Sequence, residues 1–143
     1  MFKLLTSLFN NRSKQQNKQR VFQLQPKITF RVDSFIENEI EGLVNVQNIN
    51  RNSFFRAALL DFTRSYNEVG QERFEEHWYK KSMTRLTRRY TVTLSGTLLQ
   101  EIETISASYR RNNIRFNKSL FVRCAVVDRI WNIISEEQTN GKY

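Results

Sequence analysis

The sequence predicts a mainly α fold with one short two-stranded antiparallel ribbon, built from two similar strand–helix–helix units that pair within one chain. Two observations lead to this prediction. Apolar and polar residues alternate in two stretches, residues 27–32 and 89–94, with the period of a strand that buries one face. After each stretch come two segments whose apolar residues have helical spacing. The chain has 143 residues, which suits one ordinary domain or two very small ones.

The first unit is predicted at residues 27–66. Asp33 or Ser34 can cap its first helix, and Ser53, which follows a polar turn, is expected to cap its second helix. The apolar positions of the strand and the two helices are Ile28, Phe30, Val32, Ile36, Ile40, Leu43, Val44, Val46, Phe54, Phe55, Ala58, Leu59 and Phe62.

The second unit is predicted at residues 89–135 and repeats the first. When the two units are aligned, Ile28 falls on Tyr90 and the strand patterns coincide. The turn before the last helix is longer in the second unit, and with that insertion Ser53 falls on Ser119, the expected cap. A repeat that runs through three consecutive elements indicates two copies of one structural unit.

One such unit would be unstable alone, because its strand would leave a row of backbone groups unpaired and its core would be very small. We therefore expect the two strands to pair with each other above the four helices. The residues expected to face the helices are Ile28, Phe30, Val32, Tyr90, Val92 and Leu94. The residues expected to face outward are Lys27, Thr29, Arg31, Arg89, Thr91 and Thr93.

Three segments lie outside the two predicted units, and the first of them is strongly basic. The net charge is +9, and residues 1–26 are predicted to be a basic, flexible arm. Residues 67–88 are predicted to be a partly helical connector, since a structureless loop of that length is unusual in a compact domain. Residues 136–143 are predicted to be a tail. Basic patches of this kind suit polyanions, of which nucleic acid is the commonest.

Nothing in the sequence predicts an enzyme, a metal site or a cofactor. His77 is the only histidine, and no second ligand is suitably spaced for a metal or for acid–base catalysis. Cys124 is the only cysteine, which excludes an internal disulfide and favours a reducing, cytoplasmic location. No apolar run is long enough to span a bilayer, and no signal-peptide pattern is visible.

The ordered set of motifs resembles the ribbon-helix-helix superfamily, which includes Arc, MetJ and CopG. Two units in one chain resemble the TraY-type proteins of conjugative plasmids. The segments that carry the resemblance are Lys27 to Val32, Asn52 to Leu59, Arg89 to Leu94 and Lys118 to Arg123. The resemblance implies that the six outward residues of the ribbon contact DNA bases. It also implies that the start of each second helix anchors a DNA phosphate, through Asn52, Ser53, Lys118 and Ser119.

The resemblance implies sequence-specific binding of double-stranded DNA by a transcriptional regulator, in particular a repressor, of a plasmid, phage or other mobile element. The alternative is an accessory protein of the relaxosome at an origin of transfer. Because the two units differ in their outward residues, we expect an asymmetric DNA site, or direct repeats if chains associate side by side. The arm or the connector is a candidate surface for a protein partner, and a pure interaction module would show no salt-dependent affinity for DNA.

Overall fold

The computed structural model describes residues 26–79 and 85–140. The predicted arm therefore lies outside the described residues, except for Pro26, as do residues 80–84 of the connector. The elements in chain order are β1 (Lys27–Val32), α2 (Ser34–Gln47), α3 (Arg51–Arg64), the π-helix η1 (Tyr66–Gly70), α4 (Gln71–Tyr79), β2 (Arg88–Thr93), α5 (Gly96–Arg111) and α6 (Lys118–Asn140).

The described part of the chain is mainly helical and contains one two-stranded antiparallel sheet, as predicted. Thr29 of β1 lies opposite Thr91 of β2, at the middle of the ribbon. The predicted alternation is confirmed, since all six residues expected to face the helices are buried: Ile28, Phe30, Val32, Tyr90, Val92 and Leu94.

Asparagine and aspartate cap the helices of the first half. Asp33 precedes α2, and its Oδ1 accepts a hydrogen bond from the Ile36 amide at 2.9 Å. The expectation that Ser53 caps the next helix is wrong. Asn50 is the cap, its Oδ1 accepts from the Asn52 amide at 2.8 Å, and α3 already begins at Arg51. Asparagine is as good a cap as serine, and Asn50 lies in the segment that was predicted to be a turn before Ser53.

The same correction applies to the last helix. Ser119 is not its cap, because α6 begins at Lys118 and the Oδ1 of Asn117 accepts from the Leu120 amide at 3.1 Å. When the capping residues Asn50 and Asn117 are aligned, the equivalence between the second helices of the two halves shifts by one position from the one predicted from the serines. In this alignment the buried Phe54 corresponds to the buried Phe121.

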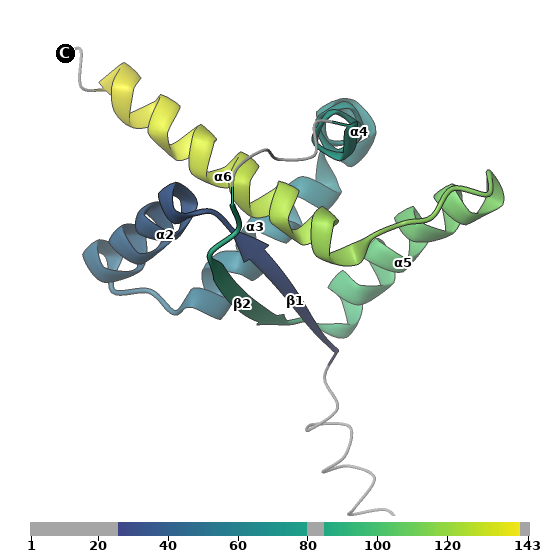
Figure 1. Cartoon of the computed structure of the whole chain (residues 1–143), viewed down its shortest axis with the longest axis horizontal. Coiled ribbons are helices and arrows are strands. Elements are labelled where there is room, and N and C mark those ends of the chain that lie inside the picture. Colours follow the sequence, from purple (N-terminus) through teal and green to yellow (C-terminus); the bar gives the residue numbers. More distant parts are fainter. Residues whose placement is uncertain (1–25, 80–84, 141–143) are drawn as a thin grey trace, which may run out of the picture.

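The second helix of each half packs mainly against the other half. Helix α3 contacts β2 and α5, whereas α6 contacts β1 and α2, and α3 and α6 also contact each other. Helices α2 and α5 lie on opposite sides of the ribbon (Figure 1). This exchange of partners buries a single core under the ribbon. Phe30 at its centre packs edge-on against Phe55, with ring centroids 5.0 Å apart.

The connector adds η1 and α4 to the side of this core. Phe74 of α4 is completely buried and packs against Phe121, with ring centroids 5.4 Å apart. At Gly70, the last residue of η1, the backbone comes close to the end of α3. A Cβ atom there would lie 3.3 Å from the Phe62 carbonyl oxygen. Helix α6 continues to Asn140, into the segment that was predicted to be a tail. Within the described ranges, no helix combines the length and apolar character needed to cross a bilayer.

Candidate functional site: the outward face of the ribbon

The outward face of the ribbon is polar and open to solvent along its length. Five of the six residues predicted to face outward are exposed: Lys27, Thr29, Arg31, Arg89 and Thr91. In the middle of this face the hydroxyl oxygens of Thr29 and Thr91 lie 3.1 Å apart. Toward one end Lys27 lies opposite Thr93, and toward the other end Arg31 lies opposite Arg89. The strand period and the antiparallel register thus bring all six predicted residues to one strip.

Thr93 differs from the other five because α3 holds its backbone. Its amide donates to Oδ1 of Asn52 at 2.8 Å, and its carbonyl oxygen accepts from Nε of Arg56 at 2.6 Å. These two contacts satisfy the backbone groups of the last residue of β2, and Thr93 is half-buried. The start of α3 therefore fixes the position of this end of the ribbon.

Three of the four residues predicted to anchor phosphate have partners within the chain. Asn52 accepts from the Thr93 amide, as described above. The Ser119 hydroxyl donates to the Thr29 carbonyl oxygen at 2.7 Å, and the Lys118 ammonium pairs with Glu103. Ser53 is exposed on the first turn of α3. The side chains of Asn52 and Ser119 thus join the starts of α3 and α6 to the ribbon.

Each half has one ion pair between its two helices. Arg51 forms a bidentate pair with Glu41, with 2.8 Å between its Nε and Oε2 and between its Nη2 and Oε1. This hydrogen bonding lowers the pKa of the Glu41 carboxyl. The Lys118 ammonium lowers the pKa of Glu103 in the same way. Arg51 and Lys118, the first residues of α3 and α6, are therefore both paired with a carboxylate of the same half.

Two arginines below the ribbon were not among the predicted site residues. Arg56 donates to Thr93, whereas Arg123 has a buried Nε with no hydrogen-bond partner among the described residues. Burial lowers the pKa of the Arg123 guanidinium. The two arginines coincide when Asn50 is aligned with Asn117, and this alignment is the signal by which the pair could have been found.

Arg88 was predicted to lie in the connector, but β2 begins at Arg88, one position before the predicted strand. Its guanidinium carbon lies 5.2 Å from the centre of the Tyr90 ring, a distance at which the cation is attracted to the ring face. Its Nε lies 3.8 Å from Oε2 of Glu37 in α2. Arg88 is therefore bound to the side of the ribbon and is not part of the outward strip.

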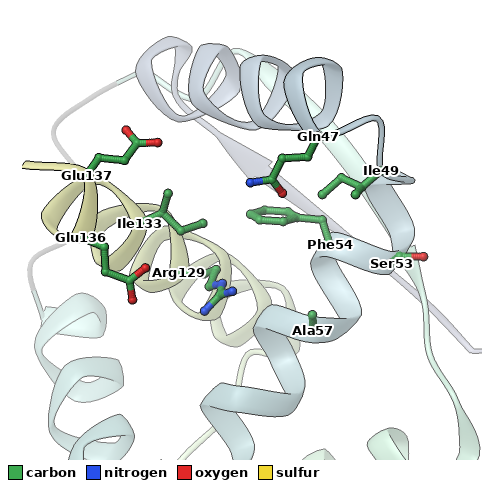
Figure 2. A pocket seen from close by; sticks show the side chains of 9 residues that line it. All are labelled: Gln47, Ile49, Ser53, Phe54, Ala57, Arg129, Ile133, Glu136 and Glu137. Atoms are coloured by element: carbon green, nitrogen blue, oxygen red, sulfur yellow. The ribbon is translucent and has the colours of Figure 1, made fainter. Parts of the chain in front are cut away.

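A groove of about 490 Å³ lies between the start of α3 and the second half of α6 (Figure 2). Phe54 and Ile133 provide apolar surface, and Glu136 and Glu137 stand at its rim. Among the described residues that line it, Ser53 is the only one with a hydroxyl, and none is a histidine or a cysteine.

Across residues 26–79 and 85–140, no three histidine, cysteine or acidic side chains come together in a way that could hold a metal ion. His77 lies in α4. Cys124 is buried in α6, and burial raises the pKa of its thiol to about 12, which opposes formation of the reactive thiolate. Cys124 is therefore a residue of the core.

No protein-family model, curated protein or solved structure matches this chain.

Proposed function

We propose that this protein binds double-stranded DNA by inserting its two-stranded ribbon into the major groove. The observation that carries the proposal is the outward strip, which presents three cationic and three hydroxyl side chains and no acid: Lys27, Arg31, Arg89, Thr29, Thr91 and Thr93. A two-stranded ribbon fits the major groove, where such side chains can bond to base edges. Bases on both strands of the DNA come within reach of one continuous surface.

We further propose that the chain is two ribbon-helix-helix units fused into an internal dimer. Three observations support this. Thr29 and Thr91 are equivalent in the repeat and also face each other, as the residue nearest a two-fold axis must do. The second helices exchange partners between the halves. The ion pairs Arg51–Glu41 and Lys118–Glu103 occupy equivalent places.

Phosphate contacts are proposed at the starts of α3 and α6. Asn52 and Ser119 hold these two helix starts against the ribbon. Free backbone amides and the helix dipole make a helix start suitable for binding an anion. In this proposal the side chains of Asn52 and Ser119 position the helices, and backbone amides of the first turns bind the phosphates.

The biological role proposed is that of a transcriptional regulator of a mobile element, which rests on the resemblance to ribbon-helix-helix proteins. The test is selection of genomic fragments by the full chain at about 150 mM salt, followed by footprinting of the enriched fragments. A discrete footprint over a promoter is the expected result. A footprint at a transfer origin would instead support the accessory role in conjugation, and no enrichment over random DNA would refute the proposed function.

The charge distribution provides a second test. Residues 1–25 contain five basic residues and no acid, so their deletion is expected to weaken binding to every DNA sequence. The slope of log affinity against log salt is also expected to become shallower, because fewer counterions are released. The site preference should be unchanged, since the ribbon residues remain. A deletion that leaves the salt slope unaltered would exclude the arm from the DNA contact.

A further inference from the structure

The two ends of the outward strip carry different chemistry. At one end, which we call the arginine end, Arg31 lies opposite Arg89. At the other, the lysine end, Lys27 lies opposite Thr93. Each strand contributes one residue to each end, and the antiparallel register places the two arginines opposite each other. The pairing of the strands therefore gathers both guanidinium groups at one end of the strip.

The arginine end has two facing cations that are not neutralised within the described chain. Like charges directly opposite each other destabilise a strand pair. Arg31 and Arg89 are both exposed, and neither forms an ion pair within residues 26–79 and 85–140. The acid beside this end, Glu37, instead contacts Arg88. A ligand with electronegative atoms would offset the repulsion.

The lysine end has one cation and one hydroxyl. The backbone of Thr93 is held by Asn52 and Arg56, which restricts how far this end can shift to meet a ligand. A lysine ammonium is a compact point charge without the fixed fork of a guanidinium. This end can thus make fewer paired hydrogen bonds to base edges than the arginine end.

We infer that the protein binds its DNA site in a single orientation, with the arginine end over a half-site that contains two guanines. This inference rests on the proposed function. A guanidinium bonds in a bidentate manner to O6 and N7 of guanine, which is the commonest specific contact in the major groove. The lysine end then covers a half-site with at most one guanine, and Thr93 can contact a thymine methyl group there.

The test is selection from a randomised DNA library with the full chain and with four variants: Arg31→Ala, Arg89→Ala, Lys27→Ala and Arg64→Ala. Each ribbon arginine variant is expected to lose one guanine preference at the same end of the selected motif. Affinity for the wild-type site should fall roughly ten- to a hundredfold. Lys27→Ala should alter only the opposite end. Arg64 is exposed at the last turn of α3, away from the ribbon, so its removal should leave the motif unchanged.

A conservative variant separates base contact from charge. Arg31→Lys retains the cation but loses the fork, so it should keep its affinity for random DNA and lose its guanine preference. The inference is overturned if the arginine and Lys27 variants alter the same end of the motif. It is also overturned if the arginine variants weaken all sequences equally, as contacts to phosphate would. Wild-type protein without salt-dependent DNA affinity would refute the proposed function itself.

Discussion

Thr29 and Thr91 face each other at the centre of the ribbon, and their hydroxyl oxygens lie 3.1 Å apart on the exposed face. The two residues hold the same position in the two predicted units. The residues that face each other at this point of the ribbon are therefore also the residues that the sequence alignment makes equivalent. The proposed DNA contact is built around this point.

Replacing both threonines with alanine is expected to change DNA base preference more than protein stability. A cross-strand pair of this kind contributes about 0.2–1 kcal/mol, so the free energy of unfolding should fall only slightly. Base preference at the centre of the DNA site should relax, because the hydroxyl and methyl groups that can touch bases are removed. Urea unfolding and library selection measure the two effects. An unchanged central preference would show that the threonines are not base contacts.

The matched arginines below the ribbon are expected to respond in opposite ways to the same substitution. Arg56→Met removes the hydrogen bond to the Thr93 carbonyl oxygen and should lower the free energy of unfolding by about 1–2 kcal/mol. Arg123→Met removes a half-buried guanidinium whose Nε has no described partner, so stability should not decrease. Thermal unfolding of both variants makes the comparison. A larger loss for Arg123→Met would mean that Arg123 has a stabilising contact.

The capping assignment predicts different costs for two neighbouring residues. Asn50→Ala removes the side-chain acceptor at the start of α3 and should cost about 1 kcal/mol. Ser53→Ala changes an exposed residue inside the helix and should stay within about 0.5 kcal/mol of wild type. Denaturant unfolding of the two variants decides the point. The reverse order would restore Ser53 as the cap.

The Arg51–Glu41 pair is expected to contribute to stability in a way that depends on pH. The pKa of Glu41 is lowered in the folded protein from its ordinary value of 4.5. The pair therefore stabilises the fold above pH 4.5, and this contribution is lost as pH falls through the lowered pKa. Glu41→Gln should be less stable than wild type at neutral pH, and the difference should vanish under strongly acidic conditions. Denaturant unfolding across a pH series measures it.

Two controls accompany the Glu41→Gln experiment. Glu136→Gln changes an exposed carboxyl near the end of α6 and should follow wild type at every pH. High salt should reduce the effect of Glu41→Gln at neutral pH, because exposed charges are screened. A difference between Glu41→Gln and wild type that persists at low pH would indicate a cause other than the ion pair.

Cys124 is expected to be unreactive in the folded protein. Burial in α6 raises the pKa of its thiol to about 12, so almost no thiolate forms near neutral pH. A thiol-specific reagent at mildly alkaline pH should label the chain rapidly in denaturant and very slowly without it. Rapid labelling of native protein would show that the end of the core around Cys124 opens readily.

The strands were predictable because local chemistry determines them. Alternation at Ile28, Phe30 and Val32 specifies which face of a strand is apolar, and burial of that face leaves one orientation. The helix starts were less predictable. Asn50 and Ser53 are both good caps, and the choice between them depends on which backbone amides the folded chain leaves without partners.

The sequence by itself determined the mainly helical content, the two strands and the six outward residues, because these follow from the spacing of apolar and polar side chains. Only the tertiary structure decided which residues face each other across the ribbon and which side chains contact its backbone. Antiparallel pairing placed Arg31 against Arg89 and Lys27 against Thr93, and packing turned Asn52 and Arg56 toward the Thr93 backbone. These contacts join residues far apart in the chain, and their geometry comes from burying one common core.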